Sequence, residues 1–134
     1  MVGFVRDNGG NTSHLVADVQ SKFCVLTLSS LDMQPISQSS LLLLTATGRV
    51  ENTGAVWNAR RTMLDVWGKA PTRIEVIKGW LTLKQLDGAV GVLVSPMDGS
   101  AKPLGETRGR RLEMGWEIAI GEKAATSYLI RVVR

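Results

Sequence analysis

The side chains best suited to recognition chemistry gather between residues 49 and 68. Trp57 and Trp67 lie close in the sequence to Asn58 and Arg60. An indole ring offers a flat apolar face on which a ligand can stack. Amide and guanidinium groups beside it can each form two hydrogen bonds with polar groups at the edge of that ligand. A sugar ring, with one apolar face and a rim of hydroxyl groups, suits this combination. The alternative is that both tryptophans anchor a long loop onto the sheet, and the sequence leaves the two interpretations open.

Tryptophan is the dominant aromatic residue, with four Trp against one Tyr and two Phe. Trp80 falls in an expected strand, where period-two alternation places it on the polar face with Thr82 and Lys84. A large apolar side chain on a polar face is unusual, so Trp80 either binds a ligand or covers the expected bulge or meets the 49–68 loop. The candidate carbohydrate-binding residues are Trp80, Trp57, Trp67, Asn58, Arg60 and Lys84.

Catalytic chemistry has little support in the sequence. His14 is the only histidine, and neither Gly-x-Ser-x-Gly nor His-Glu-x-x-His occurs. Glu113 and Glu117 would lie on one strand face, roughly 13 Å apart at ~3.3 Å per residue. Glycoside hydrolysis needs carboxylates about 5–9.5 Å apart, so we expect both to be solvated and the chain to be no enzyme.

Cofactor sites are equally unsupported. Cys24 is the only cysteine, which excludes an internal disulfide and predicts a small buried apolar residue. The turn from Asp7 to Asn11 offers oxygen ligands of the kind calcium prefers, but too few carboxylates for a calcium loop. We therefore expect no cofactor, with calcium at this turn as the alternative.

Length and composition are those of one globular domain spanning residues 1–134, with 44% hydrophobic and 21% charged residues. The net charge of +4 is spread along the chain, and the one tight basic cluster is Arg108, Arg110 and Arg111. We expect no nucleic-acid partner, because a dense basic stripe with interleaved aromatics is missing. No apolar segment approaches 18 residues, so no membrane partner is expected either.

Strand signals recur at short spacing with turn residues between them, which predicts an all-β antiparallel sandwich, immunoglobulin-like or jelly-roll-like. Asp87-Gly88 is among the clearest hairpin turns. We expect about eight strands: residues 2–6, 14–19, 23–29, 41–51, 73–86, 89–95, 110–120 and 127–133.

In two of these strands the pattern of apolar residues indicates which side chains point inward. Between Leu112 and Ile120 every second residue is apolar, which predicts that Trp116 is core. In the strand from 73 to 86 the apolar parity reverses at Lys78-Gly79, which predicts a β-bulge or bend there.

Three segments carry a family resemblance. Asn52-Thr53-Gly54-x-x-Trp57-Asn58 is the most specific. It is followed by Trp67-Gly68-Lys69-Ala70-Pro71 and preceded by Leu28-Ser29-Ser30-Leu31-Asp32-x-x-Pro35-Ile36. Across residues 22–95 the chain resembles an accessory β-sandwich domain that follows the catalytic domain in some bacterial glycoside hydrolases. Met33 stands where the resembling turn commonly has glycine.

The resemblance implies a non-catalytic module of a larger secreted enzyme that degrades polysaccharides, so the location is expected to be extracellular. Its partners would be a polysaccharide or oligosaccharide, such as cellulose-like β-glucan or xylan, and a covalently linked catalytic domain. The main hypothesis is a carbohydrate-binding module that acts by concentrating its enzyme on the substrate. The second is a structural domain that packs against the catalytic domain through the tryptophan-bearing loop, without sugar affinity.

Overall fold

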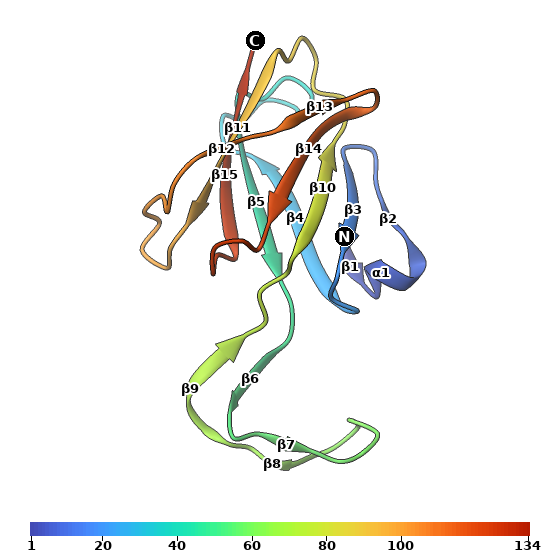
Figure 1. Cartoon of the computed structure of the whole chain (residues 1–134), viewed down its shortest axis with the longest axis vertical. Coiled ribbons are helices and arrows are strands. Elements are labelled where there is room, and N and C mark those ends of the chain that lie inside the picture. Colours follow the sequence, from blue (N-terminus) through green and yellow to red (C-terminus); the bar gives the residue numbers. More distant parts are fainter.

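A computed structural model describes all 134 residues, and antiparallel β-strands make up nearly all of its regular structure (Figure 1). Two main sheets form a sandwich, as the turn spacing predicts. Sheet A has the order β1 (Val2–Gly3), β4 (Cys24–Ser30), β5 (Leu41–Thr47), β15 (Ser127–Val133), β11 (Gly91–Met97) and β12 (Thr107–Arg108). Sheet B has the order β13 (Arg110–Leu112), β14 (Gly115–Ile120), β10 (Gly79–Leu83), β3 (Leu15–Val19) and β2 (Gly10–Asn11).

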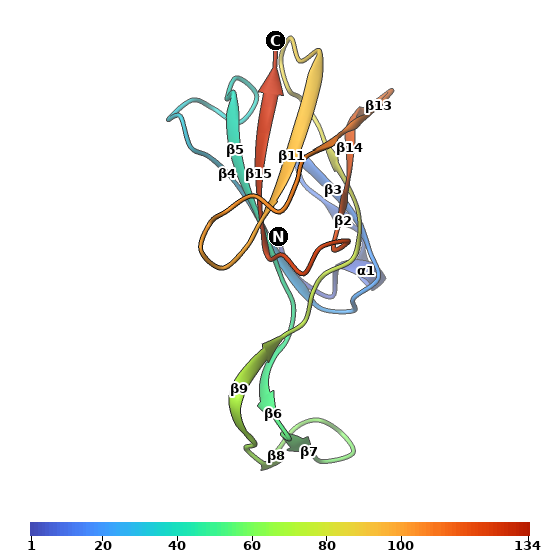
Figure 2. The same ribbon diagram turned by 60° about the vertical axis from the view of Figure 1, so that its left-hand side comes forward.

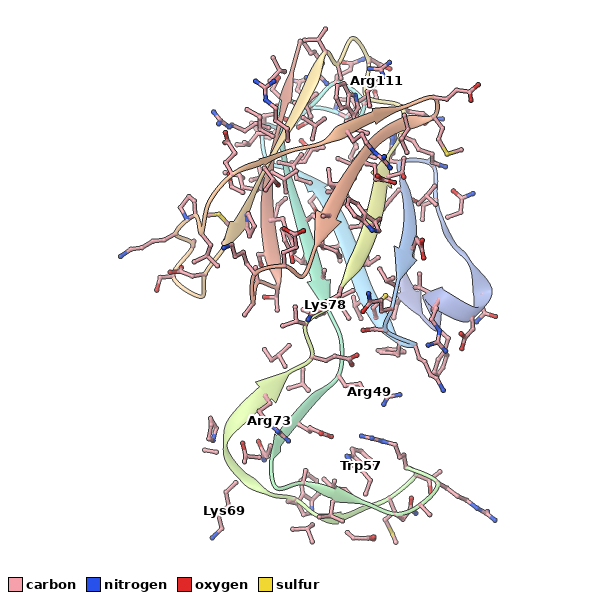
Figure 3. All side chains as sticks on the ribbon, in the orientation of Figure 1. Arg49, Trp57, Lys69, Arg73, Lys78 and Arg111 are labelled. Atoms are coloured by element: carbon pink, nitrogen blue, oxygen red, sulfur yellow. The ribbon has the colours of Figure 1, made fainter.

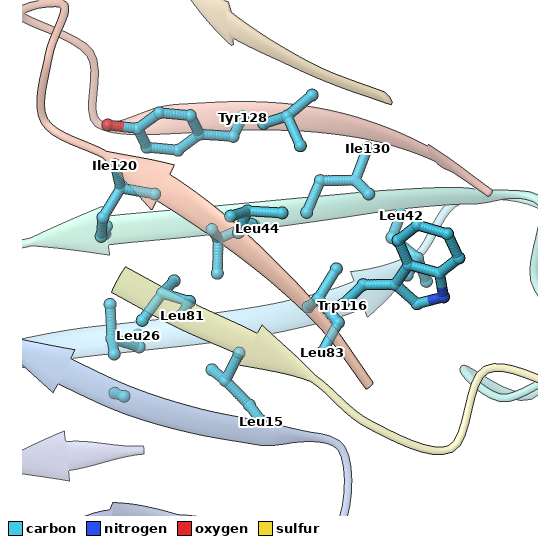
Figure 4. Close-up of a cluster of buried hydrophobic side chains, with 14 of the residues drawn as sticks. Leu15, Leu26, Leu42, Leu44, Leu81, Leu83, Trp116, Ile120, Tyr128 and Ile130 are labelled. Atoms are coloured by element: carbon cyan, nitrogen blue, oxygen red, sulfur yellow. The ribbon is translucent and has the colours of Figure 1, made fainter. Parts of the chain in front are cut away.

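The core lies between these sheets and contains 22 buried hydrophobic residues (Figure 4). It forms because alternate residues of each strand point inward. Leu42 and Leu44 of β5 face Leu81 and Leu83 of β10 from the opposite sheet, and all four are fully buried. Trp116 of β14 is only 8% exposed, which confirms its prediction as core.

Tyr128 of β15 holds the segment between β14 and β15 against the sandwich. Its buried hydroxyl accepts a hydrogen bond from the Gly121 amide at 2.9 Å and donates one to the Ala125 carbonyl at 3.1 Å. Burial raises the pKa of the Tyr128 hydroxyl above its usual value, so it stays protonated and remains a donor.

A β-ribbon projects from one end of the sandwich, and we call residues 49–75 the arm (Figures 1 and 2). Within it β6 (Val50–Thr53) pairs with β9 (Lys69–Ile74), and β7 (Val56–Trp57) pairs with β8 (Leu64–Val66). None of its residues is buried. The alternative in which two tryptophans anchor a loop onto the sheet is therefore wrong: the segment folds on itself and extends away from the sandwich.

The arm divides two expected strands. The predicted strands 41–51 and 73–86 each split, because the chain leaves the sandwich after Thr47 and rejoins it at Ile77, two residues before β10 begins. Ile77 is buried and shares the parity of Leu81, whereas Ile74 is 50% exposed and does not mark an inward face. The expectation was a β-bulge or bend at Lys78-Gly79. The structure shows no bulge there; regular strand is instead interrupted over residues 75–78, and the register shifts lie within the arm.

The expected strand 110–120 is instead the hairpin of β13 and β14. Gly115 has a φ of +153°, and a Cβ there would clash with the Leu83 carbonyl oxygen, so this position requires glycine. Met114 lies in the turn and is 62% exposed rather than inward-facing. Glu113 is in the same turn, whereas Glu117 lies on β14, so they do not share one strand face.

The N-terminal segment also departs from expectation. Residues 2–6 form only the short β1, and the chain then makes a single helical turn, α1 (Val5–Asn8). Val5 is buried against the core from this turn. The remaining expected strands occur with small shifts at their ends.

Candidate functional site

Trp80 occupies the middle of sheet B. Its strand, β10, is paired on both sides, with β3 and β14. Because Leu81 and Leu83 point into the core, Trp80 and Thr82 face outward. Trp80 is 51% exposed, which confirms the polar-face prediction and excludes the alternative that the arm covers it.

The neighbouring strands leave the Trp80 ring accessible. Its register partners are Asp18 on β3 and Ala119 on β14. Ala119 is too short to cover an indole ring, and the exposed Asp18 carboxylate has no hydrogen-bond or ion-pair partner in the chain. One step along the strands, Thr82 is flanked by Val16 and Glu117. The outer face of sheet B thus presents one large aromatic ring among small and polar side chains.

A shallow hollow lies beside the Trp80 ring, where β10 and β14 meet the end of β3. It offers an amide, an ammonium and a carboxylate within reach of one aromatic face, which is the combination that orients a hydroxyl-rich ligand. Its lining residues are Gln20, Lys78, Gly79, Trp80, Ala119, Ile120, Gly121 and Glu122.

Lys84 plays a different part from the one expected. It follows β10 directly, and its Nζ donates a hydrogen bond to Asn11 Oδ1 at 2.7 Å. This contact ties the end of β10 to β2 at the edge of the sheet, so Lys84 is engaged within the fold.

The tip of the arm carries the other predicted residues. Trp57 Nε1 donates to Glu51 Oε2 at 3.0 Å, and the Arg61 guanidinium lies 5.6 Å from the centre of the indole ring. Asn58 builds the adjacent turn, because its Oδ1 accepts a hydrogen bond from the Thr62 amide at 2.9 Å. Its side chain is therefore used locally rather than offered to a ligand.

Trp67 and Arg60 are the most open of the predicted residues on the arm. Trp67 is 76% exposed, and Arg60 is exposed with no ion pair. The structure does not bring these residues to Trp80, because the arm tip and β10 lie at different places in both ribbon views (Figures 1 and 2). The predicted site is thus two separate groups, Trp80 on sheet B and the tryptophans of the arm.

Sequence reasoning missed the neighbours that surround Trp80. Asp18, Gln20, Ala119 and Glu122 come from strands and turns far from Trp80 in sequence. The only signal in the sequence was the alternation along residues 14–19. It indicates that Asp18 faces outward, but it does not indicate which strand lies beside it.

Two other acidic residues and the cysteine considered in the sequence form ion pairs or are buried. Glu117 forms an ion pair with Arg110 at 2.6 Å, which replaces the expected solvated carboxylate. Asp7 pairs with Arg6 at 2.8 Å at the turn considered for calcium, and no three His, Cys, Asp or Glu side chains converge anywhere in the chain. Cys24 is fully buried, and this burial raises the pKa of its thiol.

The only helix, α1, is far too short to cross a membrane.

Comparison with known proteins adds no identification: no family model, curated protein or solved structure matches the chain.

Proposed function

We propose that this chain is a non-catalytic carbohydrate-binding module whose platform is the outer face of sheet B around Trp80. The observation that carries the proposal is a tryptophan 51% exposed in the centre of a five-stranded sheet. A strand paired on both sides holds its side chains more rigidly than a loop does, which suits a recognition platform.

The ligand would be a β-glucan or xylan-like chain. A pyranose ring would stack its C–H face on Trp80, and Asp18 and Gln20 would take hydroxyl groups beside it. The resemblance described above supports a role in a secreted, polysaccharide-degrading parent enzyme. There the module would raise the local concentration of the catalytic domain on its substrate.

The test is titration of the purified chain with cello-, xylo- and manno-oligosaccharides, followed by tryptophan fluorescence. The proposal expects a saturable change that Trp80→Ala abolishes while the circular dichroism spectrum is retained. Trp67→Ala is the matched control, because it removes an even more exposed indole from the arm and should leave the affinity unchanged. The absence of any change with these sugars, together with no retention on insoluble cellulose or xylan, would refute the proposal.

A second candidate is a structural role in which the arm packs against a catalytic domain. The observation that favours it is that the 27 residues of the arm hold seven of the 16 exposed large hydrophobic side chains: Val50, Val56, Trp57, Met63, Val66, Trp67 and Ile74. An isolated two-stranded ribbon is only marginally stable in water, so a partner surface would stabilise it.

Hydrogen–deuterium exchange distinguishes this second role. It expects the amides of β6 and β9 to exchange rapidly in the isolated chain and slowly in the full-length parent polypeptide. Equal exchange in the two proteins would exclude packing by the arm, whatever the sugar titration shows.

A further inference from the structure

The hollow beside Trp80 is one of three neighbouring hollows linked by shared residues. Gln20 and Lys78 line both the Trp80 hollow and a second hollow at the root of the arm. Arg49 and Glu75 line both that second hollow and a third one along the arm. We call this succession, from Trp80 to the third hollow, the track.

Cations outnumber acids along the track. Its five cationic side chains are Lys22, Arg49, Arg61, Arg73 and Lys78, against Glu51, Glu75 and Glu122. Arg61 and Glu51 pair with each other, so the excess rests on Lys22, Arg49, Arg73 and Lys78 against Glu75 and Glu122.

Glu75 and Glu51 are engaged within the chain. Glu75 accepts hydrogen bonds from Ser21 Oγ at 2.8 Å and from the Arg49 amide at 3.2 Å. Glu51 accepts the indole proton of Trp57 and pairs with Arg61 at 3.3 Å. These contacts hold the arm together, and neither carboxylate forms an ion pair with Lys22, Arg49, Arg73 or Lys78.

Four of the five cations have no carboxylate partner. The side chains of Lys22, Arg49, Arg73 and Lys78 form no ion pair within 4.0 Å, and all four residues are exposed. Figure 3 shows Lys78 and Arg49 near the junction of arm and sandwich and Arg73 further along on the arm, whereas Lys69 points away from the junction. A guanidinium group without an ion-pair partner in the chain can form two strong, parallel hydrogen bonds with the carboxylate of a ligand.

We propose that the track binds an acidic glycan, a chain bearing uronic-acid carboxylates, which extends from Trp80 along the root of the arm. This inference rests on the proposed sugar-binding function and names its substrate class. Trp80 would stack one sugar ring, and Arg49 and Arg73 would take carboxylates further along the chain.

The acids beside Trp80 favour a glycan over a nucleic acid. Asp18 and Glu122 accept hydrogen bonds from sugar hydroxyl groups. The same carboxylates would repel a backbone that carries a phosphate at every nucleotide. A sparsely charged chain, with hydroxyl groups between its carboxylates, fits a surface with acids beside Trp80 and unpaired cations at and beyond the root of the arm.

The test compares glucuronoxylan with its carboxyl-reduced form, in which the glucuronic acid is converted to glucose and the backbone is unchanged. Affinity electrophoresis or calorimetry is expected to show at least tenfold tighter binding of glucuronoxylan at 50 mM salt. The preference should weaken at 500 mM salt, since salt screens exposed charges. In the Arg49→Gln/Arg73→Gln variant the ratio of the two affinities should fall to about two or less.

Lys69→Gln is the matched control, because it removes a charge from the same arm outside the three hollows. It should retain the full preference. Equal loss in Lys69→Gln would mean that net charge alone attracts the glycan, and it would overturn the inference.

Other outcomes separate the inference from the proposed function. Equal binding of both polysaccharides, lost in Trp80→Ala, would overturn the acidic-glycan inference and leave the sugar-binding function standing. Binding of neither would overturn the inference, and the proposed function would still be decided by the titration with cello-, xylo- and manno-oligosaccharides. Tighter binding of duplex DNA, poly-glutamate or a sulfated glycan, lost in the Arg49→Gln/Arg73→Gln variant, would overturn the inference by showing that the track recognises another polyanion.

Discussion

Trp80 of β10 lies directly opposite Ala119 of β14 in the antiparallel register, so a very small side chain stands beside the largest one. We predict that Ala119→Leu blocks the approach of a sugar to the indole face and lowers affinity at least tenfold. The fold should survive, because Ala119 faces outward and contributes nothing to the core. Ala119→Ser is the control of similar size and should bind normally in the same fluorescence titration. Normal binding by Ala119→Leu would show that the ligand does not use this side of the ring.

The arm should be separable from the stability of the sandwich. We predict that replacing residues 50–74 with Asn-Gly changes the Tm by less than about 5 °C, a shift that corresponds to roughly 1 kcal/mol in a domain of this size. The reason is that no arm residue is buried, and the Glu75 amide already bonds the Arg49 carbonyl at 2.8 Å, which closes a two-residue hairpin.

Differential scanning calorimetry measures this effect, and binding of a fluorescent apolar dye should decrease in parallel. A fall in Tm of more than 10 °C would show that the arm supports the sandwich.

The layered β architecture could be predicted because its signals are local. Alternation identified the inward face of β14 and the outward position of Trp80, and Trp116 was placed correctly for that reason. The arm could not be predicted in the same way. Its strands are polar or exposed on both faces and therefore lack the alternation that burial imposes.

The residues that surround Trp80 could not be predicted from the sequence, for a different reason. Asp18 and Ala119 meet Trp80 only through the pairing of β10 with β3 and β14, which joins segments that are distant in the sequence. Alternation gives the face of a side chain but not the identity of the adjacent strand. The prediction of one strand from 110 to 120 was wrong because its alternating pattern continues through Glu113 and Met114, where the chain turns back.

Met33 occupies a backbone conformation that favours glycine. Its φ is +59°, and its side chain is 96% exposed. We predict that Met33→Gly raises the free energy of unfolding by about 0.5–1 kcal/mol, since relief of left-handed strain exceeds the entropic cost of glycine.

Urea unfolding measures this change. Met114→Gly is the control, because Met114 is also an exposed turn residue but has no positive φ. It should be neutral or destabilising. Destabilisation by Met33→Gly would show that the Met33 side chain makes a contribution that its exposure conceals.

Tyr128 is predicted to be a sensitive position for stability. Tyr128→Phe keeps the ring in the core but leaves the Gly121 amide and the Ala125 carbonyl without their partner. An unsatisfied buried polar group costs about 1–3 kcal/mol, so the variant should unfold at a correspondingly lower urea concentration. Ile130→Val is the control on the same strand, because it removes one methylene without touching a hydrogen bond and should cost about 0.5–1.5 kcal/mol. A Tyr128→Phe variant as stable as the parent would mean that water replaces the hydroxyl.

Asp32 should give the chain an acid-sensitive turn. The Ser39 hydroxyl, together with the Ser40 amide and the Ser30 hydroxyl, holds the pKa of Asp32 well below its usual value of 3.8. The Ser40 amide donates to Oδ2 at 2.7 Å, and Ser30 Oγ donates to Oδ1 at 2.9 Å. Because the folded-state pKa is lowered, this stabilisation is complete above the unfolded-state pKa and is lost as the pH falls through the folded-state pKa.

We therefore predict that Asp32→Asn is less stable than the parent chain at pH 7 and that the difference shrinks steadily below about pH 4, where the unfolded carboxyl begins to bind its proton. Urea unfolding of both proteins between pH 7 and pH 2 measures it. Asp65→Asn is the control, since it removes a carboxylate that lies on the exposed arm without an ion pair, and it should be as stable as the parent chain at pH 7. A difference between Asp32→Asn and the parent that stays constant down to pH 2 would mean that the turn depends on the shape of the side chain and not on its charge.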